Sequence, residues 1–136
     1  MRHINNMPLF FMFSKLLFIL LGSGLGGVCR YLLGKAVHPS LFPVFPWGTF
    51  VVNILGCLII GILYGLIDRG FNLSENMRLF LTVGFCGGFT TFSTFMHENY
   101  LLFTSPQILT VIVYAGLSIM VGLLFVYIGY LITSVV

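Results

Sequence analysis

The chain has 136 residues, of which 59% are hydrophobic and 7% are charged, and its formal net charge is +3 at pH 7. This composition leaves too little polar surface for a water-soluble globular domain. A spanning helix takes roughly 20 apolar residues, so four such segments with short connections use nearly the whole length. The sequence therefore predicts an all-α integral membrane protein with four transmembrane helices in one domain, at residues 16–136, and no nucleic-acid partner.

Residues 1–15 combine a basic start with a short aromatic run, and we interpret them as a mobile or interfacial lead-in. This pattern mimics a signal peptide, but the apolar stretch continues past Gly22 to Leu33 and is long enough to span a membrane. We therefore expect the first helix from about Leu16 to about Val37. Its glycines Gly22 and Gly26 have the spacing that lets another helix approach closely.

Arg30 is the conspicuous charge of the first apolar segment. An arginine near a helix end often extends to the lipid headgroups. Its place beside Gly26 and Gly27 instead favours a partner inside the protein, and both interpretations stay open.

The second helix is expected from near Gly48 to about Ile67, after a proline-rich loop and an interfacial Trp47. Asn53 lies about one and a half turns inside this helix, too deep to reach water from outside. Its carboxamide either bonds a neighbouring helix or donates N–H groups to a species that enters the membrane.

The third segment contains Gly84–Phe95, in which three glycines are followed by threonines and serine interleaved with phenylalanine. We expect Ser74 or Glu75 to cap this helix and the helix to break around 87–90. A bilayer tolerates broken backbone only where it is buried, binds an ion or lines a wet path. The alternative is close helix packing through Gly84 and Gly88.

Phe92 and Phe95 are three apart and are expected on one face of the resumed helix. Aromatic rings carry a positive edge and are weak partners for an anion, although such pairs more often face lipid or the core. Glu98 lies a turn further on and either caps the helix end at the interface or closes a polar path.

The fourth helix, from about Pro106 to Thr133, carries no charge. Its polar positions Thr110, Tyr114 and Ser118, followed by Gly122, form one stripe. This stripe is either an association face or one wall of a solute path.

A four-helix unit of this size has little interior, so we expect an oligomer. With four spans, both termini lie on the same side as the second loop. The cations then divide into Arg2, Lys15, Arg69 and Arg78 on that side and Arg30 and Lys35 on the other. Because this bias is weak, the sequence permits insertion in both orientations and antiparallel pairing.

Three ordered motifs carry a family resemblance. Gly26–Tyr31, Pro46–Gly56 and Gly84–Phe95 closely resemble the signatures of the CrcB/Fluc fluoride channels. The resemblance implies a passive fluoride channel, not an enzyme, in the cell inner membrane, where it confers fluoride resistance. It also implies an antiparallel homodimer with two pores and one structural sodium ion at the dimer interface, held by backbone carbonyls that fall on Gly87 and Thr90.

The same resemblance assigns the pore residues. Fluoride is expected to contact Asn53, Phe92 and Phe95 and a track of hydroxyl groups on Thr49, Ser93, Thr94, Tyr114 and Ser118, with Glu98 near the end of the pore. Some relatives continue the track with another serine, where this chain has Gly122.

Two rival functions remain. A small proton-coupled cation or drug antiporter is also a four-helix antiparallel dimer, but it needs a carboxylate in the first helix, which has none. A non-transporting membrane scaffold predicts a packed, dry helix break and no ion flux.

Overall fold

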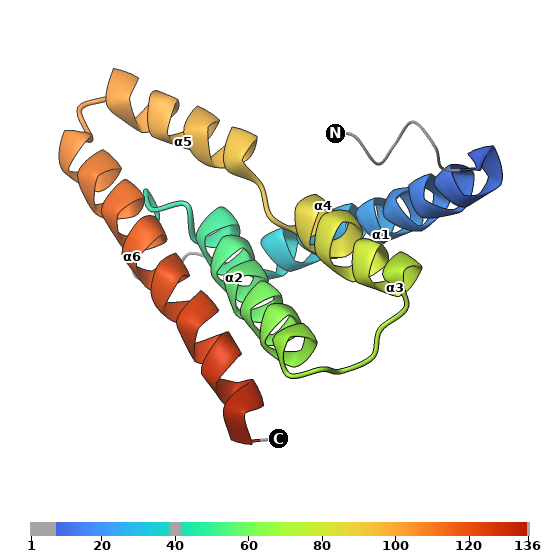
Figure 1. Cartoon of the computed structure of the whole chain (residues 1–136). Coiled ribbons are helices and arrows are strands. Elements are labelled where there is room, and N and C mark those ends of the chain that lie inside the picture. The colour runs from blue at the N-terminus through green and yellow to red at the C-terminus, as the bar shows by residue number, and fades with distance from the viewer. Residues whose placement is uncertain (1–7, 39–41, 136) are drawn as a thin grey trace.

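The computed structural model describes residues 8–38 and 42–135, and every element within these ranges is helical. In chain order the elements are α1 (Leu9–Ala36), α2 (Trp47–Asp68), α3 (Glu75–Leu79), the π-helix η1 (Phe80–Cys86), α4 (Gly87–Phe89), α5 (Phe92–Thr104), α6 (Ile108–Ile132) and the 3-10 helix η2 (Thr133–Val135) (Figure 1). Four stretches are long and apolar enough to span a membrane: Leu9–Ala36, Trp47–Asp68, Glu75–Thr104 and Ile108–Val135. The predicted all-α fold with four transmembrane helices is confirmed.

The helices pack in two pairs. α2 lies along α6, and α1 lies along η1 and α4, with the two pairs crossing each other (Figure 1). Glycines set the distance within both pairs, because a Cβ at Gly61 or Gly129 would meet backbone of the facing helix, and one at Gly26 would meet the backbone of Phe85. Without a hydrophobic driving force between helices in lipid, such backbone approach is a main source of packing energy. The predicted role of Gly22 and Gly26 is confirmed.

α1 begins at Leu9, seven residues before the predicted start at Leu16. Pro8 precedes the helix, where its missing N–H and restricted φ do no harm, and no helix breaker follows. Residues 9–15 are therefore helical and continuous with the first span. The rest of the predicted lead-in, residues 1–7, lies outside the described residues.

The third span does break, but not at its glycines. Thr90 (φ −78°, ψ 157°) and Thr91 (φ −147°, ψ 114°) are extended, whereas Gly87 and Gly88 are helical. A Cβ at Gly84 or Gly88 would meet the backbone of α1, so these glycines serve the close packing that was the alternative interpretation. The break falls on the two threonines because β-branched residues tolerate extended backbone and Thr91 caps α5.

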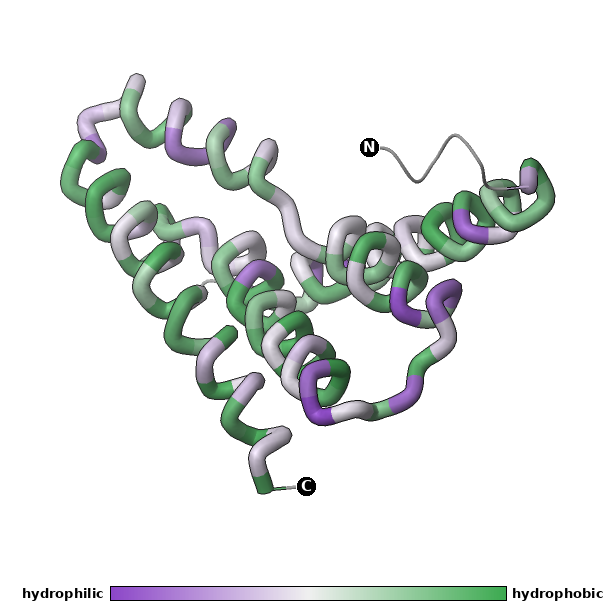
Figure 2. The backbone as a smooth tube through the Cα atoms, in the orientation of Figure 1, coloured by the Kyte–Doolittle hydropathy of each residue, from purple (hydrophilic) through white to green (hydrophobic). Residues whose placement is uncertain are grey.

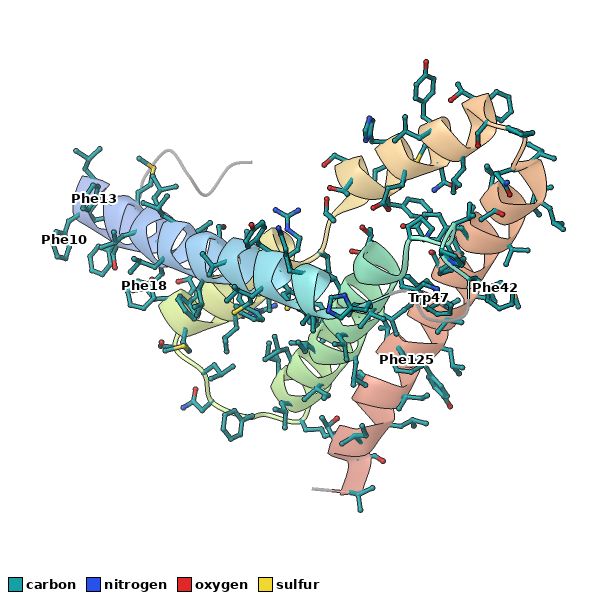
Figure 3. All side chains as sticks on the ribbon, turned by 180° about the vertical axis from the view of Figure 1, so that it is seen from behind. Phe10, Phe13, Phe18, Phe42, Trp47 and Phe125 are labelled. Atoms are coloured by element: carbon teal, nitrogen blue, oxygen red, sulfur yellow. The ribbon has the colours of Figure 1, made fainter. Side chains whose placement is uncertain are left out.

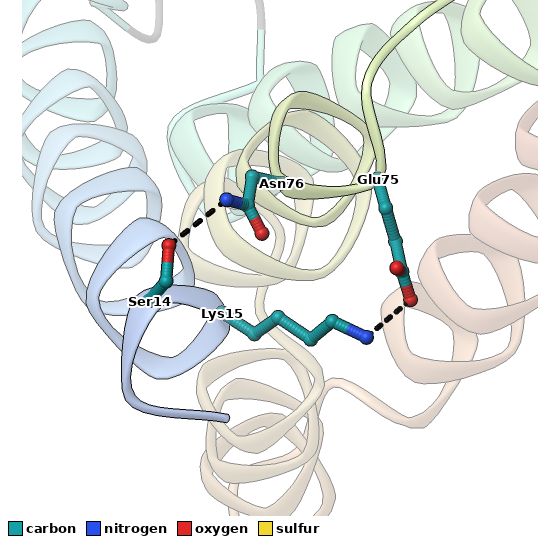
Figure 4. Close-up of polar contacts among 4 residues, drawn as sticks. All are labelled: Ser14, Lys15, Glu75 and Asn76. Carbon is teal, nitrogen blue, oxygen red and sulfur yellow. Dashed lines mark hydrogen bonds and ion pairs between the residues drawn. The ribbon is translucent and has the colours of Figure 1, made fainter. Parts of the chain in front are cut away.

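Polar contacts show which helix ends and loops lie on the same side of the molecule. Lys15 pairs with Glu75 at 2.5 Å, and the Asn76 amide donates to Ser14 at 2.9 Å, which ties the start of α1 to the start of α3 (Figure 4). At the other side of the α2–α3 connection, the Tyr130 hydroxyl donates to Asp68 at 3.1 Å. The start of α1, the second loop and the end of α6 therefore lie at one end, as predicted. Ser74 caps α3 by accepting from the Met77 N–H at 3.3 Å, also as predicted.

The surface is apolar along the spans. Large hydrophobic side chains on α6 are mostly exposed, including Leu109 (71%), Met120 (71%) and Leu123 (72%). Hydrophilic residues gather instead at the end of α2, in the connection that follows and at the start of α3 (Figure 2). Such a surface is stable against lipid or another apolar protein surface, so the chain is a multi-pass membrane protein.

Candidate functional site

The side chain of Asn53 holds the helix break in place. Its Nδ2 donates to the carbonyl oxygen of Thr91 at 3.2 Å, and the Thr91 N–H donates to its Oδ1 at 2.8 Å. The carboxamide thus replaces the helical partners that Thr91 loses where α4 ends. Asn53 therefore makes the interhelical contact that the sequence left as one alternative, and its second N–H is not used in this pairing.

Two backbone carbonyl oxygens at the break, those of Gly87 and Thr90, have no side chain that replaces their lost helical donors. The Thr90 N–H and Oγ1 both donate to the carbonyl oxygen of Cys86, at 3.0 and 2.9 Å. Within the described residues, no hydrogen bond reaches the carbonyl oxygens of Gly87 and Thr90. The break thus presents acceptors that the chain alone leaves unsatisfied.

These features line an open groove of about 480 Å³ between α2, the break and α6. Its walls include most of the residues expected at a pore or cation site: Asn53, Gly87, Thr90, Phe92, Phe95 and Ser118. The Ser118 Oγ is buried and has no hydrogen-bond partner among the described residues. The groove therefore combines an unused amide N–H, an unpaired hydroxyl and two aromatic rings.

The two phenylalanines differ in how they face this groove. Phe92 is 74% exposed, whereas Phe95 is 9% exposed. The rings of Phe95 and Tyr114 are in an edge-to-face arrangement with centroids 5.0 Å apart, and the Phe95 ring lies 5.9 Å from that of Phe92. Phe95 is thus part of the core between α5 and α6, and Phe92 is free on the surface of the single chain.

Glu98 does not cap a helix end but joins three elements. Thr49 on α2 donates to its Oε1 at 2.6 Å, and the Tyr114 hydroxyl on α6 donates to its Oε2 at 2.7 Å. Both hydroxyl hydrogens therefore point to the carboxylate and are unavailable to an anion while these bonds last. Sequence reasoning placed all three residues near a pore but missed this network.

A second groove, of about 530 Å³, lies on the other side of Thr91. Arg30 and Lys35 line it together with Glu98, Thr49 and Thr94. Within the described residues Arg30 makes no hydrogen bond or ion pair, so the structural partner favoured from the sequence is not found in this chain. The excess of cations makes this groove attractive to small anions.

The remaining hydroxyl groups gather at the start of α5. The Thr91 Oγ1 accepts from the Thr94 N–H at 3.3 Å, donates to the Thr94 Oγ1 at 3.0 Å and lies 3.4 Å from the Ser93 Oγ. The hydroxyl track expected from the sequence is thus divided in the single chain. Ser118 faces the first groove, Thr49 and Tyr114 bond Glu98, and the others surround the helix cap.

Comparison with known proteins gives the family. The model of the family described as "CrcB-like protein, Camphor Resistance (CrcB)" matches residues 17–130. The chain belongs to the CrcB family.

Several curated proteins similar to this chain share the name fluoride-specific ion channel FluC. The chain is 50% identical over 120 residues to the fluoride-specific ion channel FluC of Bacteroides fragilis, which covers 85% of this chain and 93% of the relative. It is 40% identical over 123 residues to the protein of that name from Azobacteroides pseudotrichonymphae, with 90% and 98% covered. The protein of that name from Flavobacterium psychrophilum is 42% identical over 121 residues, with 89% and 98% covered.

Gly122 lies where α6 packs against α2. A Cβ at Gly122 would lie 3.3 Å from the Cys57 sulfur on α2. This is tighter than usual contact, so a side chain at position 122 requires the Cys57 side chain to shift by a few tenths of an ångström. Gly122 therefore serves the packing of this helix pair.

Sequence reasoning also missed the central role of Thr91. This residue caps α5, pairs through its backbone with Asn53 and touches both grooves. The local signal was a threonine three residues before Thr94, the spacing between an N-cap side chain and the backbone N–H that donates to it.

Proposed function

We propose that this protein is a fluoride-selective channel that conducts fluoride passively across the membrane and so lowers its cytoplasmic concentration. The observation that carries the proposal is the first groove, where Asn53, Phe92, Phe95 and Ser118 meet beside a broken membrane helix. Three relatives of nearly the same length are named fluoride-specific ion channels, which supports the same function. The antiporter alternative lacks support, because α1 contains no Asp or Glu.

The chemistry of fluoride suits these groups. Fluoride is small and strongly hydrated, so a selective path must replace its water without binding it too tightly. The unused N–H of Asn53, the hydroxyl of Ser118 and the positive edges of the two phenylalanine rings are donors of this kind. Several weak hydrogen-bond donors placed one after another along the path allow an ion to enter and also to leave.

We infer that the channel is an antiparallel homodimer with two pores. The groove is open in the single chain, and a Cβ at Gly87 would meet no atom within 4 Å, so this face of the break has room for a second subunit. Phe92 is also exposed there. A two-fold axis in the membrane plane generates the second pore from the same residues.

A structural sodium ion between the subunits is part of this proposal. The carbonyl oxygens of Gly87 and Thr90 lack hydrogen-bond partners within the described residues. Carbonyl oxygens are ligands that suit a hard cation. When bound, the ion supplies positive charge that compensates these carbonyls. We propose backbone oxygen as the ligand of this site; the described residues contain no cluster of three or more His, Cys, Asp or Glu side chains that could hold a metal ion.

The deciding experiment is ion efflux from liposomes that contain the purified protein, loaded first with fluoride and then with chloride and read by ion-selective electrodes. Fast release of fluoride with retention of chloride supports the selective channel. No release of either ion, from protein shown to be folded and dimeric, contradicts it and favours the scaffold alternative.

A further inference from the structure

α1 is longer than a membrane requires. Its cations Lys15 and Lys35 are separated by 20 residues. At a rise of about 1.5 Å per residue these span about 30 Å, the thickness of the hydrocarbon core. The Lys15–Glu75 and Asn76–Ser14 contacts mark one boundary of that layer (Figure 4). The residues before Ser14 therefore extend beyond it.

This projecting segment, Leu9–Phe13, contains no polar side chain and is called the aromatic end below. Its large side chains are exposed: Leu9 (79%), Phe10 (77%), Phe11 (58%) and Phe13 (66%). Phe10 and Phe13 lie at the free end of α1, away from the other helices (Figure 3). The CrcB match begins only at residue 17, so the aromatic end lies outside the region that defines the family.

We propose that the aromatic end is embedded in the headgroup region of the bilayer, where it anchors α1 at that surface. Successive residues of a helix are rotated by about 100°, so the exposed side chains of residues 9, 10, 11 and 13 together cover about 200° of the helix circumference. A partner helix covers one stripe, whereas lipid surrounds a helix on all free sides. Arg78 is exposed about one turn after Glu75, the partner of Lys15, so it lies at the same end of the molecule. Its positive charge is complementary to lipid phosphates.

The position of the aromatic end can be measured with a tryptophan reporter. Trp47 is the chain's one tryptophan, so Trp47→Phe gives a silent background to which Phe10→Trp is added. The dimer is reconstituted in vesicles of phosphatidylcholine and phosphatidylglycerol brominated either near the headgroup or near the middle of the acyl chain. We expect the shallow bromine to quench the reporter at least about twofold more than the deep bromine.

Leu20→Trp is the matched control, because Leu20 is 68% exposed on the same helix but lies inside the hydrocarbon layer. Its order of quenching is expected to be reversed. Quenching of the Phe10→Trp reporter by aqueous acrylamide but by neither bromolipid places the aromatic end in water and overturns the proposal. Protection from all three quenchers means that protein covers it, which also overturns the proposal. Phe13→Trp repeats the measurement if the first variant does not fold.

Discussion

Replacement of Asn53 by alanine tests the link between the helix break and conduction. The variant loses both hydrogen bonds to Thr91, of 3.2 and 2.8 Å, and leaves that N–H and carbonyl without partners in a half-buried site. A hydrogen bond contributes about 0.5–1.5 kcal/mol net, and measured values between membrane helices are about 0.6 kcal/mol. We therefore expect the free energy of unfolding to fall by about 1–3 kcal/mol and fluoride efflux to be lost.

The assay is reversible unfolding in mixed micelles, followed by fluoride efflux from liposomes with the same protein preparation. Leu55→Val is a matched control, because Leu55 is also half-buried on α2 but lines neither groove. This control is expected to change stability by less than about 0.5 kcal/mol and to conduct. If Asn53→Ala matches it in both stability and flux, Asn53 does not hold the break and the reasoning is refuted.

Three further predictions concern the pore, the helix packing and the cation. Phe92→Ile is expected to abolish fluoride efflux without loss of stability of the single folded chain, in which Phe92 is 74% exposed, whereas Phe95→Ile loses efflux and also about 1–2 kcal/mol from the α5–α6 core. Efflux at the parent rate in either variant, measured on intact dimers, contradicts the pore assignment. Gly26→Ala pushes a methyl group into the backbone of Phe85 and is expected to cost about 1–3 kcal/mol, while Gly24→Ala meets open space and is the control. Equal thermal stability of these two variants counts against the packing argument. Replacement of sodium by N-methyl-D-glucamine during purification and reconstitution is expected to lower both the dimer fraction and fluoride efflux. Both are expected to recover when sodium is added back. Unchanged fluoride efflux without sodium contradicts the proposed structural sodium site.

The Gly84–Phe95 stretch shows how far sequence reasoning reached. Its composition correctly predicted an interruption, because threonine and serine favour caps and extended backbone over helix interior. It placed the interruption around 87–90, which includes Thr90, whereas the structure has it at Thr90 and Thr91 and leaves the glycines helical. Gly84 and Gly88 are helical because the backbone of α1 lies against them, and a contact between segments some 60 residues apart is not written in local propensity.

The same division applies to the polar groups. The sequence by itself determined four membrane spans, since hydrophobic length and the scarcity of charge are properties of composition. The family resemblance of its motifs named part of the lining of the first groove, including Asn53, Phe92 and Ser118, but also residues that lie elsewhere. Only the tertiary structure decided what each group bonds. Glu98 accepts from Thr49 and Tyr114, and Asn53 pairs with Thr91, because helix packing brings together atoms that are distant in the chain. Hydrogen bonds act over about 3 Å, so their partners follow from the packing of the helices and not from the order of residues.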